Sequence, residues 1–352
     1  MMINNNRSGK GKTITKGGNR MLIYNPKNLF LLLTVIFCLI LSSYAIADGL
    51  KVYQCYRMME EPVLDGKADD LIWSTIPAEV GFVNISTGVF TIKQSFFKMG
   101  YDDNALYIFM RCEEPDMRKI NAKLGDMRDL WTEDSVEVFL QPEGNEAYFQ
   151  FVVNAIGSRW NGRYVNGKNT ESKLGDWKAM VYRGSDYWNL EVKIPFDYLG
   201  IKPVGEWRGN IGRNIRTTQE LTTWSPMKGR FHDTTRFGRI IFIDQFLKSD
   251  QAREVEKKAN QAVYNSIESE ISELIMELYS WQLFFKESSK TRRNRDAVRI
   301  IDKIDIIKVK SDTSERSLGE KVLFLHELKN LHKEANELRS KLLLEEMFSM
   351  AQ

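Results

Sequence analysis

The amino-acid sequence predicts an all-β sandwich of antiparallel strands followed by an α-helical, coiled-coil-like tail. The first observation is a series of short runs of alternating apolar and polar residues, separated by turn residues; this pattern is typical of a sandwich or barrel. The second is a change in composition, because residues 246–352 hold one glycine, Gly319, and no proline. We therefore predict a β-sandwich domain over residues 48–245 and a helical tail over residues 246–352.

An apolar run, residues 29–41, precedes the β-rich region. A helix that spans a bilayer needs about 20 apolar residues, so this run is short for a permanent span. Basic residues lie before it, and the small-x-small sequence Ala45-Ile-Ala47 follows it. These features predict an N-terminal extension and secretory signal peptide, residues 1–47, with cleavage after Ala47 and export to the periplasm or the medium. An uncleaved membrane anchor is the alternative.

The charge and the cysteines limit the classes of partner. Fifty Lys and Arg against 47 Asp and Glu give a net charge of +3, which provides no electrostatic reason to expect a nucleic-acid partner. Cys38 lies in the apolar run, so Cys55 and Cys112 remain after cleavage. An even number in an oxidising compartment allows one disulfide. Both positions also suit small buried side chains, and the two interpretations stay open.

Four segments illustrate the predicted strands, namely residues 105–112, 135–140, 148–154 and 188–194. Successive residues of a strand point to opposite faces, so each segment has an apolar face and a more polar one. We expect the apolar faces of the second and third segments to line the sandwich core. These apolar residues are Val136, Val138, Leu140, Phe149, Phe151 and Val153.

The tail carries two apolar stripes at heptad spacing. The stripes are Ile271, Leu274, Leu278, Trp281 and Phe285, and then Phe324, Leu328, Leu331, Ala335, Leu338 and Leu342. Such stripes pack against another helix. With breaks near Ser288 and across residues 311–314, and a capping box at Ser317 and Glu320, the pattern predicts a helical hairpin or a three-helix tail. Self-association or a protein partner through this tail is expected.

The polar faces of two strands suggest a binding cleft. Glu137 shares its strand with the apolar set but points the other way, as do Gln150 and Asn154 in the next strand. Trp131 comes just before the first of these strands, where a loop could hold its ring over the cleft. Sugars need this combination, because their C–H faces stack on aromatic rings while their hydroxyls need fixed donors and acceptors.

A series of sequence landmarks follows in a characteristic order. They are Asp65-Gly66 with Trp73, Tyr101-Asp-Asp-Asn-Ala-Leu-Tyr107, Cys112-Glu-Glu-Pro-Asp116, Leu130-Trp131-Thr-Glu-Asp134, Phe149-Gln-Phe-Val-Val-Asn154, Thr223-Trp224-Ser-Pro226, Phe231-His-Asp233 and Arg236-Phe-Gly238. In this order they resemble the carbohydrate family 9 binding-module superfamily over about residues 50–245. The resemblance implies a sandwich of the CBM9 and DOMON type and, as its function, saccharide binding.

The resemblance also implies a site in which two tryptophans hold a sugar at a chain end. Trp131 and Trp224 match these tryptophans, Glu137 matches a carboxylate that bonds the hydroxyls, and Asn154 matches an amide. Together with Gln150 these residues form the predicted ligand site.

The sequence departs from the family pattern at Val152, where the sugar-binding member has a polar, basic residue. Arg213 is the candidate for the missing cation, although its position in the strand also allows a structural role. Relatives also carry structural calcium, for which Asp65, Asp69 and Asp70 are the candidates, although these residues equally suit turn and helix-cap roles. No other cofactor is implied.

Several other residues have structural interpretations. Trp73, Trp188 and Trp207 lie at apolar or strand positions and are expected in the core, whereas Trp177 is undecided. We expect His232 to be a structural histidine rather than a ligand or a base.

The combined expectation is an exported, non-catalytic carbohydrate-binding protein that takes an oligosaccharide end in an aromatic cleft and serves carbohydrate catabolism. An accessory domain of a glycoside hydrolase system is an alternative. An enzyme is disfavoured, because Glu133, Asp134 and Glu137 should not all face one cleft as a glycosidase pair must. A haem-binding electron-transfer subunit is a third class, since some relatives bind haem through Met and Lys, and a Soret band would identify it.

Overall fold

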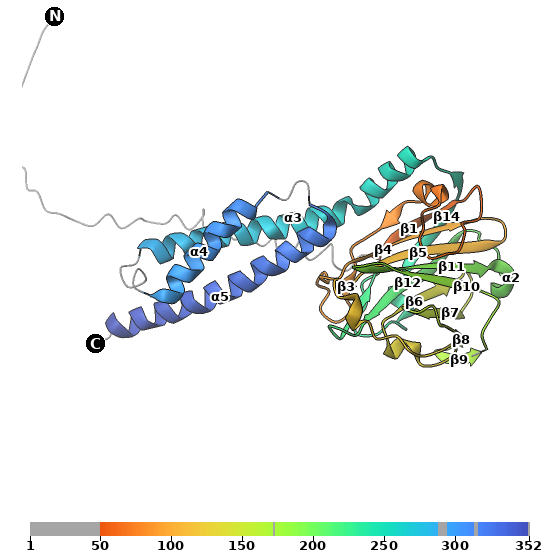
Figure 1. The fold of residues 1–352 in the computed structure, drawn as a ribbon, viewed down its shortest axis with the longest axis horizontal. Coiled ribbons are helices and arrows are strands. Elements are labelled where there is room, and N and C mark those ends of the chain that lie inside the picture. The colour runs from red at the N-terminus through yellow and green to blue at the C-terminus, as the bar shows by residue number, and fades with distance from the viewer. Residues whose placement is uncertain (1–49, 172, 288–293, 313–315, 351–352) are drawn as a thin grey trace, which may run out of the picture. The chain divides into compact units, whose positions relative to one another are not determined.

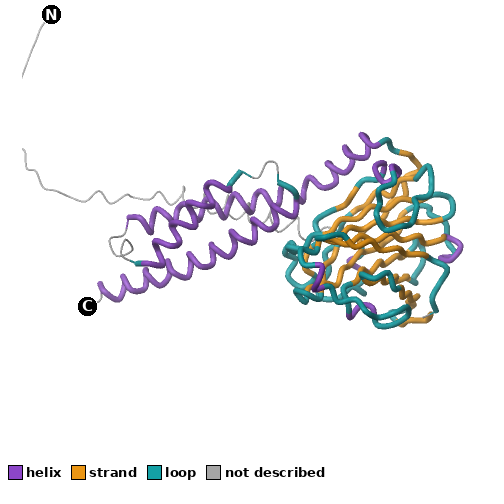
Figure 2. Tube along the Cα trace, viewed as in Figure 1, coloured by secondary structure: helices purple, strands orange, loops and turns teal. Residues whose placement is uncertain are grey.

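The computed structural model describes residues 50–171, 173–287, 294–312 and 316–350. The predicted signal peptide, residues 1–47, lies outside these residues. Strands occupy the described chain up to Phe246, and helices occupy it from Ser249 onward, as Figures 1 and 2 show. No helix in the described ranges combines the length and apolarity needed to cross a bilayer.

The strands are short and are separated by turns. They are β1 (Val52–Arg57), β2 (Ala78–Glu79), β3 (Val83–Asn84), β4 (Ser95–Tyr101), β5 (Ala105–Glu113), β6 (Ser135–Gln141), β7 (Tyr148–Asn154), β8 (Arg159–Val165), β9 (Lys168–Glu171), β10 (Lys178–Arg183), β11 (Tyr187–Pro195), β12 (Glu206–Ile215), β13 (Glu220–Thr223) and β14 (Gly238–Phe246). Between them lie the short helices η1 (Leu71–Thr75), η2 (Met117–Lys119), η3 (Leu130–Thr132), α2 (Phe196–Leu199) and η4 (Thr234–Arg236).

The strands form one continuous, mixed sheet. Its main path runs β10-β11-β5-β4-β1-β14-β12-β6-β7-β8-β9. β1 pairs in parallel with both β4 and β14, whereas the other paired strands are antiparallel. The expected antiparallel pairing is thus correct for most strand pairs but not for those of β1. The pairing joins all strands of the described chain into one curled sheet, so a sandwich of two separate sheets is not confirmed. Because β1 and β14 come from opposite ends of the β-rich region, no local pattern could show their pairing.

The sheet curls around one main apolar core (Figure 1). Core residues come from β5 and β11 in one half of the strand order and from β6 and β7 in the other half, so both halves face the same interior. All six residues expected in the core, from Val136 to Val153, belong to it. This prediction from alternating polarity is confirmed.

The tryptophans expected in the core are buried. Trp73, Trp188 and Trp207 are each at most 2% exposed. Trp177, which the sequence left undecided, is also buried, and its indole N–H donates to Asn161 Oδ1 at 2.8 Å. Buried tryptophans commonly find such a partner.

Cys55 and Cys112 are both buried and unbonded. Cys55 lies on β1 and Cys112 on β5, and β4 separates these strands in the sheet. Two strand spacings of roughly 4.8 Å each exceed the Cα separation of about 7 Å that a disulfide allows. The structure therefore supports the interpretation as small buried side chains and not the disulfide.

The expected helices are present after the sheet. They are α3 (Ser249–Glu287), α4 (Arg295–Lys310) and α5 (Leu318–Met350). At the start of α5 the backbone N–H of Ser317 donates to the Glu320 carboxylate at 2.8 Å, and the N–H of Glu320 donates to Ser317 Oγ at 3.3 Å. This is the reciprocal capping box that the sequence indicated.

The two heptad stripes pack within the tail. Residues of both stripes, including Ile271, Leu278, Leu328 and Ala335, belong to one apolar cluster that also contains Ile304 of α4. The stripes therefore bury one another without a second chain. The coiled-coil geometry, the domain boundaries and self-association through the tail stay predictions.

Candidate functional site

A cavity of about 340 Å³ lies beside β6, β7 and β12. The residues that line it are Trp131, Glu137, Gln150, Tyr164, Asn214, Arg216, Leu221, Phe231 and His232. Three of the predicted site residues, Trp131, Glu137 and Gln150, are thus brought together. Polar groups and aromatic rings share the walls, which is the composition that the sequence predicted for the cleft.

Glu137 is the centre of the polar wall. It is 3% exposed, and its Oε1 accepts from Asn214 Nδ2 at 2.7 Å while its Oε2 accepts from Gln150 Nε2 at 2.6 Å. Burial raises the pKa of the Glu137 carboxyl, and the two amide donors and Arg216 act in the opposite direction. These bonds fix the orientation of both amides.

Gln150 leaves one polar atom unused. Its Oε1 is buried and has no hydrogen-bond partner in the described part of the chain. An unpaired buried acceptor costs about 1–3 kcal/mol, and Gln150 lines a cavity. A ligand hydroxyl that donates to this oxygen would remove that cost.

The sheet register explains why these side chains share one face. Glu137 on β6 lies opposite Gly212 on β12 and Val152 on β7. Residues directly opposite in a ladder point to the same side of a sheet, so alternate residues on all three strands face the cavity. A Cβ at Gly212 would come within 2.7 Å of the Phe231 ring. Only glycine leaves room there for the ring that closes this wall.

Trp131 forms an aromatic wall on η3. It is half-buried, and its ring meets Trp160 edge-to-face with centroids 5.2 Å apart. Trp160 packs in turn against Leu130 and Val152. Val152, which is apolar where the sugar-binding family member has a basic residue, thus supports the rings beside the cavity.

The cation expected from Arg213 comes instead from Arg216. Arg213 is fully buried and donates to the carbonyl oxygens of Lys93 and Glu113 at 3.2 and 2.8 Å, away from the cavity. Arg213 and Asn214 are adjacent on β12, so their side chains point to opposite faces of the sheet. Arg216 follows the end of the strand, lines the cavity, and donates to the backbone oxygen of Trp131.

Trp224 and Asn154 do not reach the cavity walls. Trp224 is 1% exposed in the main core, with its ring edge-to-face on Phe97 and above Gly238, where a Cβ would meet it at 2.6 Å. Asn154 is fully buried; its Nδ2 donates to Leu124 O at 3.0 Å and to Glu133 Oε2 at 2.9 Å. Asn154 therefore holds the loop that leads to Trp131.

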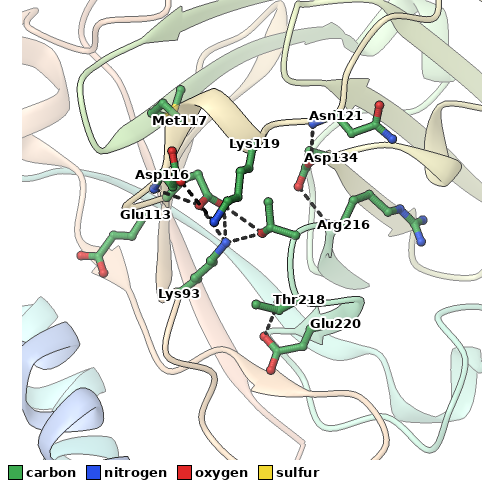
Figure 3. Close-up of polar contacts among 12 residues, drawn as sticks. Lys93, Glu113, Asp116, Met117, Lys119, Asn121, Asp134, Arg216, Thr218 and Glu220 are labelled. Atoms are coloured by element: carbon green, nitrogen blue, oxygen red, sulfur yellow. Dashed lines mark hydrogen bonds and ion pairs between the residues drawn. The ribbon is translucent and has the colours of Figure 1, made fainter.

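The neighbouring acids also hold loops. Asp134 lies between Asn121 and Arg216 and accepts from the backbone N–H groups of both, at 2.7 and 3.0 Å (Figure 3). Glu133 accepts from the N–H of Lys123 at 2.7 Å. Of the three acids that the sequence grouped, only Glu137 lines the cavity, so this cluster does not form a glycosidase pair there.

Sequence reasoning missed Tyr164, Asn214 and Arg216 and assigned His232 a structural role. Strand alternation could have indicated Asn214, because it lies two residues after Gly212 on the same strand and therefore on the same face. His232 is exposed at the cavity, and its Nδ1 lies 2.8 Å from the Tyr148 hydroxyl. The protein atoms packed around part of the imidazole ring remove some of its hydration, and this desolvation together with the positive charge of nearby Arg230 lowers the pKa of His232, which favours the neutral ring.

The structure does not group the three calcium candidates as metal ligands within the described chain. Asp65 Oδ1 accepts from the N–H of Lys67 at 2.9 Å, and Asp70 Oδ2 accepts from the N–H of Val63 at 2.9 Å. Asp69 is exposed. Among the described residues, no three His, Cys, Asp or Glu side chains are grouped as metal ligands. The turn role that the sequence indicated fits Asp65 and Asp70.

Comparison with known proteins adds a family assignment. Residues 64–245 match the family model described as carbohydrate family 9 binding domain-like. No protein of curated function matches the chain.

Solved structures are also similar. One is named as a carbohydrate-binding protein from Bacteroides uniformis, with 18% identity, a TM-score of 0.49, and coverage of 55% of this chain and all of that one. A family 9 carbohydrate-binding module from Caldicellulosiruptor kristjanssonii with cellotriose gives 20% identity, a TM-score of 0.43, and coverage of 55% and 95%. A family 9 carbohydrate-binding module from the same organism with glucose gives 21% identity, a TM-score of 0.40, and coverage of 55% and 96%.

Proposed function

Because the chain belongs to the carbohydrate family 9 binding domain-like family over residues 64–245, we propose that it is an exported, non-catalytic protein that binds a saccharide in the cavity beside Trp131. The ligand is an oligosaccharide end, and the role is in carbohydrate catabolism. A cavity of about 340 Å³ is at the small end of the range for ligand pockets, roughly 300–1,000 Å³. This size favours one or two sugar units over a long chain.

The observation that carries the proposal is the polar wall at Glu137. Its carboxylate and the unpaired Oε1 of Gln150 are acceptors fixed beside the half-buried ring of Trp131. Sugar hydroxyls donate to such acceptors, and sugar C–H faces pack on such a ring. His232 also lines the cavity, and because Tyr148 engages its Nδ1, Nε2 is the ring nitrogen left for a ligand.

Affinity should be weak. With Trp224 in the core, the site has one stacking tryptophan instead of two. One such contact is worth on the order of 1 kcal/mol beyond area burial, and each net hydrogen bond about 1 kcal/mol. After the cost of association, this predicts dissociation constants of roughly millimolar order.

Calorimetry of the mature chain with glucose and cellotriose tests the proposal. We expect saturable binding of at least one of them and about fivefold weaker binding in Trp131→Ala, because the stacking contact is lost. Trp281→Ala is the matched control, since it removes another half-buried tryptophan, in α3. Equal affinity of the wild type and Trp131→Ala, with unchanged melting temperatures, would place the site elsewhere.

Export is tested separately. Mass spectrometry of the exported chain should find Asp48 at the N-terminus, because Ala45-Ile-Ala47 is the expected cleavage sequence. Retention of residues 29–41 would identify an anchor instead. Turnover of an oligosaccharide by contaminant-free protein, lost in Glu137→Gln, would contradict the non-catalytic assignment.

A further inference from the structure

Tyr164 and Trp131 line the cavity beside Glu137 from its two ends. Tyr164 on β8 lies directly opposite Tyr148, the first residue of β7. Trp131 instead packs in the apolar cluster of Val152. Residues 148 and 152 are four positions apart on β7, which is roughly 13 Å along a strand. Gln150 lies between them on the same face, so the polar wall separates the two rings.

The Tyr164 ring is held by an aromatic stack. It lies parallel to the ring of Tyr148, with centroids 4.9 Å apart and an angle of 2° between the planes. Tyr148 is 4% exposed, and its hydroxyl is 2.8 Å from His232 Nδ1. The His232 ring is also close to Tyr164, at 5.0 Å between centroids. Because the ring is already fixed, a ligand that contacts it pays little for ordering this side chain.

The hydroxyl of Tyr164 is open to a ligand. The side chain is half-buried at the cavity, and no hydrogen-bond partner of its hydroxyl lies within the described ranges. Burial and the negative charge of Glu137 raise the pKa of Tyr164. The hydroxyl therefore keeps its proton at neutral pH and can donate it to an acceptor.

Other donors of the cavity are already engaged. Asn214 Nδ2 donates to Glu137 Oε1 at 2.7 Å and to Ser135 Oγ at 3.0 Å, which uses both of its hydrogens. Arg216 directs Nε and Nη2 to backbone oxygens. Sugar hydroxyls accept as well as donate, so the fixed acceptors of the polar wall are complemented by the Tyr164 donor.

We infer that Tyr164 is a ligand-binding residue of this cavity and that its hydroxyl donates to an oxygen of the bound saccharide. The inference rests on the proposed function, because it takes the same cavity as the saccharide site. It adds a contact at the end of the polar wall away from Trp131, a part of the site for which the sequence suggested no residue.

Calorimetry of the mature chain with glucose and cellotriose tests the inference in Tyr164→Phe. This variant keeps the ring that stacks on Tyr148 and removes the donor, so we expect about fivefold weaker binding with an unchanged melting temperature. Tyr182→Phe is the matched control, because it removes the hydroxyl of an exposed tyrosine on β10, outside the lining of this cavity. Tyr164→Leu, which also lacks the hydroxyl, serves if Tyr164→Phe does not fold.

The outcomes separate this inference from the proposed function. Weaker binding in both Trp131→Ala and Tyr164→Phe supports both. Weaker binding in Trp131→Ala with wild-type affinity in Tyr164→Phe overturns the contact at Tyr164 and leaves the proposed site in place. Weaker binding in Tyr164→Phe alone supports the contact at Tyr164 and overturns the stacking on Trp131. An equal loss in Tyr182→Phe overturns the inference, and no binding of either sugar by the wild type overturns both.

Discussion

The β-rich region and the helical tail both fold around apolar clusters, but they differ in the carboxyls that they bury. In the β-rich region Glu79 and Glu137 are buried and their pKa values are raised, chiefly by desolvation. In the tail the pKa values of Asp305 and Glu320 are lowered by hydrogen bonds at exposed positions. A curled sheet can surround a polar group from several strands, whereas each tail helix keeps its charged face in water. Fixed acceptors for a ligand are therefore found in the sheet.

Truncation of the sheet core should have the largest effect on stability. Trp224→Ala removes a ring that packs on Phe97 and Tyr53, and such a change costs about 3–5 kcal/mol. This is a large part of a typical stability of about 5–15 kcal/mol. Urea unfolding followed by tryptophan fluorescence measures it. Trp131→Ala is the control and should leave stability nearly unchanged; a stable Trp224→Ala variant would mean that the ring is outside the core.

Truncation of the tail core should have a smaller and separable effect. Leu328 is fully buried in the tail cluster, and Leu328→Ala should cost about 2–5 kcal/mol. Circular dichroism at 222 nm should show the loss of helix at lower temperature. Saccharide binding should persist, because none of the residues lining the Glu137 cavity lies in the tail. Loss of binding in folded protein would show that the two regions are coupled.

The smallest expected effect is an opposite response of the two regions to acid. Groups with a raised folded pKa, such as Glu79 and Glu137, destabilise the sheet at neutral pH, so its stability should rise as the pH falls towards the ordinary glutamate value of 4.5. Asp305 and Glu320 have lowered pKa values, so their contribution persists in that window and is lost only at more acid pH.

Thermal melts from pH 7.5 to 3.5 distinguish the regions. Near-ultraviolet circular dichroism reports mainly the sheet, because all tryptophans except Trp281 precede the tail. Far-ultraviolet dichroism reports the helices. A sheet that is most stable at pH 7.5 would contradict the buried-carboxyl argument, and Glu137→Gln should reduce the gain on acidification.

Much of the candidate site could be predicted from strand alternation. Glu137 and Gln150 share the predicted face, and Trp131 lies beside them. Alternation also indicated that Arg213 could have a structural role, because its position in the strand allows it to point away from the cleft. It could not show that Arg216, just past the strand end, would turn into the cavity, because alternation ceases where the ladder ends.

The assignment of Trp224 shows a different limit. A tryptophan in a turn-like sequence suits a cleft wall as well as a core, and burial decides between them. That burial depends on Gly238 and Phe97, which lie on β14 and β4. The position of His232 at the cavity likewise depends on a remote residue, because its ring contacts the Tyr148 hydroxyl on β7. Neither contact has a signal within its own segment.

The sequence by itself determined whether each region is β-rich or helical and on which side of its strand each residue lies, because these depend on periods of two and of 3.5 residues. It also determined the family, because the landmarks follow one another in a characteristic order. The tertiary structure decided that β1 lies between β4 and β14, that Cys55 and Cys112 stay apart, and which faces are covered. The physical reason is that burial is set by neighbours brought from remote parts of the chain. A residue's own segment fixes its direction but not what covers it.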